Sequence, residues 1–196
     1  MSEQAETVNK SYLSFKLGKE EFAAHTSKVL NILERQEITE VPKAPVYMKG
    51  VINLRGTVLP VIDTRVKIGM PPVDYTFDTC ILVLDIVIDG EVVQVGAIVD
   101  SVQAVLEFED KEIQPPPSIG SKYKSEFITG IIRKDERFIM IMDVVKIFSI
   151  EDIVVLKAVN GGNKGQTKTV NAGNKGQTKT VNEGNEDQTK TEKAGK

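Results

Sequence analysis

One pattern occurs twice in this chain, and the repetition restricts the folds that the chain can adopt. Each copy consists of a glycine, two β-branched residues, a polar turn, a second apolar run and an aspartate. The first copy runs from Gly50 to Asp63 and the second from Gly130 to Asp143, so the spacing is the same in both. An aspartate at this place can cap a following helix. The repetition predicts two units of similar structure.

The sequence around both copies consists of short apolar runs separated by turn residues. Residues 27–33 are echoed by residues 100–106, so each half contains strand, strand, a short apolar turn or helix, strand and strand. Asp89-Gly90 is a strong hairpin signal, and Pro60 predicts an edge strand because proline has no backbone N–H. The apolar runs predict strands at 12–17, 20–24, 50–54, 57–62, 80–88, 92–99, 102–108, 127–132 and 137–142.

Two short helices are expected beside these strands. Residues 29–33 have apolar side chains at the i, i+3, i+4 spacing of a helix, and Thr26 or Ser27 is placed to cap it. Residues 149–158 have a similar pattern. Such a stripe most often faces the core, although a short helix over a small barrel can leave part of it open to a partner.

Strands of this length and spacing are typical of small antiparallel barrels, and the duplication predicts two of them. We expect a mainly β fold with a flexible N-terminus at 1–10, a first barrel at about 11–75 and a second at about 76–148. A terminal helix at about 149–158 can pack back on the first barrel. Each half is close to the lower size limit for a separate core, so the barrels are expected to share one.

Residues 159–196 differ from the rest in composition. They contain three copies of an eleven-residue repeat in which a single valine is the recurrent apolar residue, and the third copy is decayed. Such a segment cannot bury enough apolar surface to offset about 1–2 kcal/mol of backbone entropy per residue. We expect a disordered tail, either without a dedicated ligand or acting as a weak basic tether for anionic surfaces.

Net charge divides at the same place. Residues 1–158 carry 18 Lys and Arg against 24 Asp and Glu, whereas the tail carries 7 against 4. A mildly acidic body argues against nucleic acid as the partner, because affinity for a duplex comes largely from clustered Lys and Arg. No apolar stretch approaches the roughly 18 residues of a membrane span, and no secretory signal is recognised. We expect a cytoplasmic protein without direct membrane insertion.

Catalytic and metal-binding chemistry has little support in the sequence. Cys80 and His25 are the sole cysteine and histidine, so the chain has neither a disulfide framework nor a Cys/His zinc cluster. Neither residue lies in a nucleophile signature, and the acidic residues single out no acid–base pair. We predict no catalytic residue, no metal and no cofactor.

Asn53-Leu54-Arg55-Gly56 forms a polar turn between two very apolar strands. The strands hold the arginine, and its guanidinium can make several directed hydrogen bonds to a carboxylate or to peptide carbonyls. Recognition residues concentrate on loops of rigid scaffolds. A turn arginine that satisfies its own backbone is equally compatible with this pattern.

Around this turn the chain resembles the CheW-type coupling proteins of bacterial chemotaxis. The most specific stretch is residues 42–63, PKAPVYMKGVINLRGTVLPVID. Other similar segments, in the same order, are LGKEEF at 17–22, VDSV at 99–102, VL at 105–106, IQP at 113–115 and MDVV at 142–145. The resemblance covers about residues 11–150 without a large gap.

The resemblance implies two SH3-like five-stranded barrels on a shared core, without catalytic activity or cofactor. Proteins of this family bridge the cytoplasmic tips of chemoreceptors and the regulatory domain of the histidine kinase CheA, and they help to build the signalling array. In the family, the receptor contacts the groove between the barrels, and the kinase contacts the barrel ends. Carried over, the resemblance implies that partners bind at Val29, Asn31, Ile32, Asn53, Arg55 and Gly56.

The chain departs from the family pattern at three places. Where the family often has a glutamate that can pair with the motif arginine, this chain has Asn31, so the charge-assisted pair is lost. The usual Asp-Leu-Arg is Asp63-Thr64-Arg65, and the repeated tail has no counterpart. We expect the free coupling protein rather than a fusion to a kinase or a receiver.

Two other functions stay open from the residues alone. A single-stranded nucleic-acid binder would need exposed aromatic residues interleaved with basic ones, whereas the phenylalanines stand mostly in apolar contexts. A hydrolase would depend on Cys80 and His25.

Overall fold

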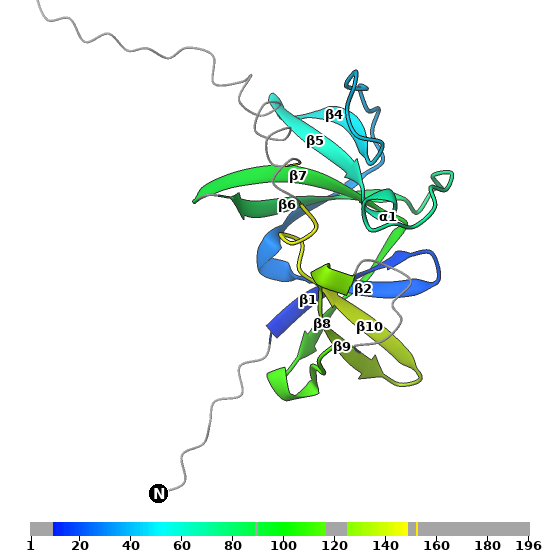
Figure 1. The fold of residues 1–196 in the computed structure, drawn as a ribbon, viewed down its shortest axis with the longest axis vertical. Helices are drawn as coiled ribbons and strands as arrows, with labels where there is room; N and C mark the ends of the chain where they lie inside the picture. The colour runs from blue at the N-terminus through cyan, green and yellow to red at the C-terminus, as the bar shows by residue number, and fades with distance from the viewer. Residues whose placement is uncertain (1–9, 89, 117–124, 149–151, 153–196) are drawn as a thin grey trace, which may run out of the picture. The chain divides into compact units, whose positions relative to one another are not determined.

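The computed structural model describes residues 10–88, 90–116, 125–148 and 152, and these residues form two five-stranded sheets (Figure 1). The strands are β1 (Lys10–Leu17), β2 (Glu20–His25), β3 (Val29–Glu34), β4 (Met48–Leu54), β5 (Thr57–Asp63), β6 (Cys80–Ile88), β7 (Glu91–Val99), β8 (Ser101–Phe108), β9 (Ile128–Lys134) and β10 (Arg137–Met142). The short helices are η1 (Thr26–Lys28), α1 (Thr64–Lys67), η2 (Asp110–Glu112) and η3 (Ser125–Phe127). The mainly β fold is confirmed.

The two halves of the chain exchange strands between the sheets. The first sheet has the order β8-β1-β2-β10-β9, and the second has the order β3-β6-β7-β5-β4. Each strand from β1 to β5 has its counterpart five numbers later, in β6 to β10. When every strand is replaced by its counterpart, the order of the first sheet becomes the order of the second, as the duplication predicts. Each half gives its first hairpin to one sheet and its last three strands to the other. The division into barrels at 11–75 and 76–148 is therefore wrong, because apolar runs specify strands but not their neighbours.

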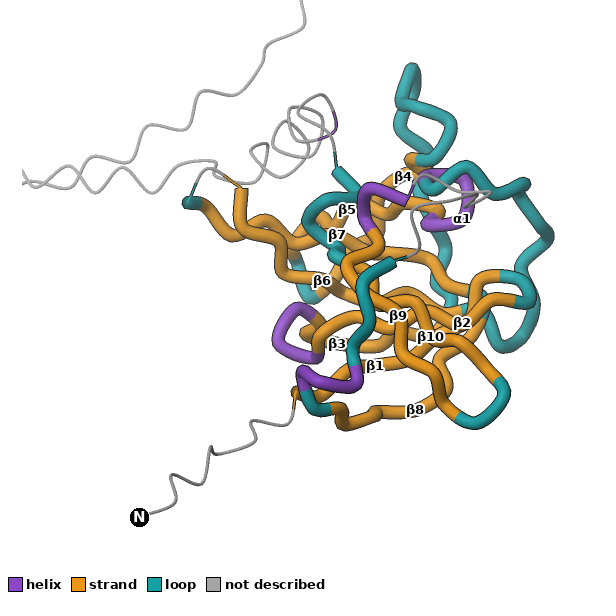
Figure 2. Tube along the Cα trace, turned by 60° about the horizontal axis from the view of Figure 1, so that its bottom comes forward, coloured by secondary structure: helices purple, strands orange, loops and turns teal. Residues whose placement is uncertain are grey.

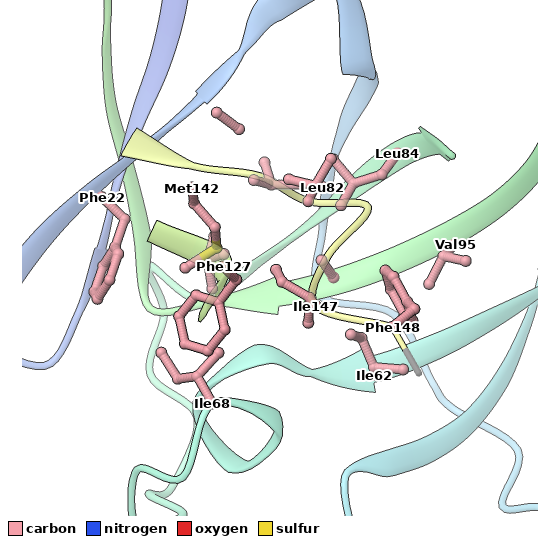
Figure 3. Packing of buried hydrophobic residues seen from close by; sticks show 14 of the residues in the cluster. Phe22, Ile62, Ile68, Leu82, Leu84, Val95, Phe127, Met142, Ile147 and Phe148 are labelled. Carbon is pink, nitrogen blue, oxygen red and sulfur yellow. The ribbon is translucent and has the colours of Figure 1, made fainter. Parts of the chain in front are cut away.

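The largest hydrophobic cluster joins both sheets, which confirms the shared core. It includes Phe15 and Phe22 of the first sheet and Leu82 and Leu84 of the second. Figure 3 shows Phe22, Leu82 and Leu84 among the residues of this cluster. Each sheet also encloses a smaller cluster of its own. The first of these contains Tyr12, Ala23, Phe108, Ile132, Ile139 and Ile141, and the second contains Ile52, Leu59, Val61, Ile81, Val83 and Ile98.

The two copies of the duplicated pattern end in the same way. Asp63 caps α1 by accepting a hydrogen bond from the backbone N–H three residues on, at 3.2 Å. Asp143 accepts one from the N–H two residues on, at 3.0 Å. Five residues after each aspartate, Ile68 and Phe148 enter the shared core. The capped turn therefore delivers a large apolar side chain to the same cluster from both halves.

Two local predictions are wrong. Residues 29–33 form strand β3 rather than a helix, because their β-branched residues pair with β6 at positions such as Ile32 opposite Leu82. β5 lies between β4 and β7, so the edge position predicted from Pro60 is wrong. The sheet accepts this proline because β7 pairs with β5 only at residues 61–63, and Pro60 lies outside that ladder. The hairpin at Asp89-Gly90 is confirmed by the β6–β7 pairing.

Predictions for three segments lie outside the described residues. They are the flexible N-terminus, the terminal helix apart from Asp152, and the tail with its repeats.

Candidate functional site

An open groove of about 330 Å³ is lined by residues of both sheets. β3 is the edge strand of the second sheet and β8 the edge strand of the first. The lining residues are Leu13 of β1, Thr26 of η1, Val29, Leu30, Asn31 and Ile32 of β3, and Val105 of β8.

The walls of this groove are apolar and open to solvent. Leu30 is 51% exposed, Ile32 46% and Val105 61%, whereas Leu13 is buried. Isolated exposed apolar residues are common, but several around one groove mark a place where another molecule binds.

A bulge in β3 explains why so many of its side chains are exposed. The register with β6 shifts between Val29 and Asn31, so Leu30 has no partner opposite it. Such a bulge redirects side chains out of the regular alternation. At the start of β3, the Thr26 hydroxyl donates to the carbonyl oxygen of Ser11 at 3.1 Å, which ties η1 to the first sheet.

The Asn53–Gly56 turn joins β4 and β5 and does not line the groove. The Gly56 backbone N–H donates to Asn53 Oδ1 at 2.8 Å, and Arg55 and Gly56 have φ of 54° and 87°. Arg55 is exposed and forms no ion pair with the residues that the structure describes. Asn53, rather than Arg55, therefore satisfies the turn, and the guanidinium is available to a partner.

The structure thus separates the six predicted binding residues into two groups. Val29, Asn31 and Ile32 line the groove, whereas the other three lie on the β4–β5 turn. The amide oxygen of Asn31 accepts a hydrogen bond from the backbone N–H of Ile32 at 3.0 Å.

Four groove residues were missed by the sequence analysis, namely Leu13, Thr26, Leu30 and Val105. The duplication contained a signal for Val105, because β8 is the counterpart of β3 in the other half. Nothing in the sequence indicated that these two edge strands share one groove.

Comparison with known proteins decides the family. The model of the CheW-like domain matches residues 11–152. The chain belongs to the CheW-like domain family. The chemotaxis protein CheW of Klebsiella aerogenes is 35% identical over 154 residues, which cover 79% of this chain and 90% of that protein. The probable chemotaxis protein CheW of Rhizobium etli is 36% identical over 141 residues, covering 72% and 88%.

A solved structure also resembles this CheW-like domain. The crystal structure of the scaffolding protein TtCheW from Thermoanaerobacter tengcongensis superposes with a TM-score of 0.66 at 28% identity. The match covers 74% of this chain and 96% of that one.

Cys80 and His25 belong to different sheets of the CheW-like domain. His25 Nδ1 accepts the backbone N–H of Ser27 at 3.2 Å and so caps η1. Cys80 begins β6 and packs against the shared core. Across the described ranges, no cluster of His, Cys, Asp and Glu could hold a metal ion, and no helix is long and apolar enough to span a membrane.

Burial raises the pKa of the Cys80 thiol, and this gives a prediction. Because the thiolate is the reacting form, a raised pKa leaves less of it at pH 8. We expect Cys80 in the folded protein to react with an aromatic disulfide reagent about tenfold more slowly than free cysteine. In urea the rate should return to that of free cysteine, and the folded-state rate should keep rising above pH 9. A folded-state rate equal to that of free cysteine would contradict the burial.

Proposed function

We propose that this CheW-like protein is a non-enzymatic adaptor of bacterial chemotaxis. It couples chemoreceptors to the histidine kinase CheA and helps to assemble the signalling array, acting in the cytoplasm at the receptor tips. The observation that carries this proposal is the groove between the sheets with its exposed Leu30, Ile32 and Val105. Family membership supports it, since the relatives are named chemotaxis proteins and one solved neighbour is named a scaffolding protein.

The groove is the docking site for the cytoplasmic tip of the receptor. An apolar side chain that is transferred from water into such a site contributes roughly 1.5–3 kcal/mol when fully buried. Burial of the three exposed apolar side chains by the receptor is therefore enough to stabilise a specific contact.

The Arg55 turn is a second contact point. Its backbone is held by Asn53 and its side chain is exposed, so little conformational freedom is lost when the guanidinium binds a carboxylate or a carbonyl. The regulatory domain of CheA binds at the ends of the barrels.

The nucleic-acid alternative has no support from the groove. Among the described residues, its lining contains no aromatic side chain and no Lys or Arg. Proteins that bind single strands need both, because bases stack on aromatic rings and phosphates pair with cations.

A groove variant tests the receptor site. With Ile32→Glu, we expect binding to receptor fragments in a co-sedimentation assay with CheA to weaken at least tenfold, because the carboxylate is desolvated against apolar walls. Val92→Glu is the matched control, since Val92 is an exposed valine of β7 outside the groove. A ternary complex of unchanged affinity with Ile32→Glu would refute the assignment of the groove as the receptor site.

A variant of the β4–β5 turn tests the second contact point. Arg55→Glu should weaken the ternary complex, whereas Arg133→Glu on the counterpart hairpin should not.

A further inference from the structure

The geometry points to a strap behind the groove. We propose that residues 143–148, fastened through Asp152 to Lys67, set the spacing of the two sheets and thereby position the walls of the groove. Lys67 and Asp152 are positioning residues, which we call the latch. That the groove binds a receptor rests on the function proposed above, whereas the role of the strap in spacing the sheets does not.

The strap passes from one sheet to the other. It begins where β10 leaves the first sheet, and its Val144, Ile147 and Phe148 are buried in the shared core. Figure 3 shows Ile147 and Phe148 close to Ile62 and Val95, which belong to β5 and β7 of the second sheet. The strap therefore fills space between the sheets rather than covering one of them.

The turn that starts the strap is held by hydrogen bonds. The carboxylate of Asp143 accepts the backbone N–H groups of Val145 and Lys146 at 3.0 and 3.4 Å. The Phe148 N–H donates to the Val145 carbonyl at 3.2 Å. These bonds direct Ile147 and Phe148 into the core.

The latch closes the strap onto α1. Asp152 is almost fully buried and forms an ion pair with Lys67 Nζ, which also lies 4.0 Å from the centre of the Tyr47 ring. The two side chains of the pair are 3% and 12% exposed. A buried carboxylate without its cation is strongly destabilised, so this pair holds the Asp152 side chain in a single place.

The shared core connects the strap with the groove. Leu13, which forms the floor of the groove, and Val29, which lies beside it, pack in the same cluster as Ile147 and Phe148. In Figure 2, α1 and β3 lie apart. A close-packed core transmits a displacement from one side to the other. When the strap loosens beside α1, the groove walls on the opposite side of the core therefore become free to move. By linkage, a ligand in the groove must also strengthen the latch.

Distances across the groove test the strap without any partner. Full-length protein with Cys80→Ser, Leu30→Cys and Val105→Cys is spin-labelled, and pulsed EPR records the distance between β3 and β8. We expect a narrow distribution with the latch intact and a broader, shifted one with Asp152→Asn. Replacing the whole pair by apolar residues, Lys67→Met with Asp152→Leu, should restore the narrow distribution, because a packed apolar pair can substitute for a buried ion pair.

A matched control separates positioning from general loss of stability. Ile52→Ala creates a cavity in the interior cluster of the second sheet, on β4, the strand farthest from β3 in that sheet, and should leave the distribution narrow. The proposal is overturned if Asp152→Asn leaves the distribution unchanged, if Ile52→Ala broadens it equally, or if the apolar pair does not restore it. Should Asp152→Asn fail to fold, Phe148→Leu replaces it, because this variant loosens the strap and keeps the latch. The proposal then requires that Phe148→Leu broadens the distance distribution, and an unchanged distribution overturns it.

Binding provides the second measurement, on protein without labels. Asp152→Asn should weaken binding of receptor fragments threefold to tenfold, and the apolar pair should recover it. If the unaltered protein binds no receptor fragment, the proposed function fails while the distance measurement still decides the strap. If the unaltered protein binds and Asp152→Asn binds equally well, the strap fails while the proposed function stands.

Discussion

A Phe22→Ala variant is expected to lose about 3–5 kcal/mol of unfolding free energy, which is the range for phenylalanine removed from a packed core. Phe22 is fully buried in the cluster that joins the two sheets, and its ring stacks on Phe15 with 6.1 Å between centroids. Since domains of this size have about 5–15 kcal/mol in total, the variant should be close to unfolding at 37 °C. Urea denaturation at 25 °C, monitored by circular dichroism, gives the difference.

Phe138→Ala is the matched control for that experiment. Phe138 lies on β10, the neighbour of β2, but its side chain is 59% exposed. Removing it should cost less than about 1 kcal/mol, because little buried apolar area is lost. Equal losses for the two phenylalanines would show that the shared core is not where most of the stabilisation lies.

An Asp100→Ala variant is expected to lose about 2–4 kcal/mol, because it strands a buried guanidinium. Asp100 Oδ2 accepts hydrogen bonds from Arg65 Nη1 and from the Gly18 backbone N–H, each at 2.5 Å. Arg65 also donates from Nε to the carbonyl oxygen of Pro71 at 3.3 Å. The Arg65 side chain is only 9% exposed, whereas that of Asp100 is 28% exposed, and this exposure places the loss below that of a fully buried pair.

The surface pair Lys10–Asp110 is the control for that variant. Its atoms are 2.7 Å apart, but the side chains are 41% and 65% exposed. Water screens exposed pairs, so they contribute little to stability, and Asp110→Ala should change the free energy of unfolding far less than Asp100→Ala does. Added salt should reduce this small difference and leave the Asp100 effect largely intact, because buried charges are screened less. A loss for Asp100→Ala no larger than for Asp110→Ala would contradict the role of Arg65 as a link.

Arg65 also shows how far motif matching reaches. The sequence analysis treated Asp63-Thr64-Arg65 as a departure in its middle residue. In the structure the arginine of α1 pairs with Asp100 at the β7–β8 junction, and the same carboxylate accepts the backbone N–H of Gly18 in the β1–β2 turn. Those partners are remote in the chain, so no spacing rule could have paired them.

The candidate site was predicted in part. Val29, Asn31 and Ile32 lie in the groove, although the predicted helix is a strand. The helical spacing of residues 29–33 is real, but Val29 and Ile32 are β-branched, and residues 29–34 pair with β6. Pairing with a neighbouring strand overrides local propensity, because it satisfies backbone groups that a short exposed helix would leave to water.

The sequence by itself determined the described strands other than β3, the Asp89-Gly90 hairpin, the capping aspartates and the existence of two related halves. The strands, the hairpin and the caps depend on residues close together in the chain, where alternation, turn chemistry and capping act directly, and the two halves are recognised because one such local pattern occurs twice. Only the tertiary structure decided that the halves exchange hairpins, that β3 and β8 border one groove, and that Asp152 meets Lys67. Those contacts join segments far apart in the chain, and they form because the exchange buries the apolar faces of both halves in one core.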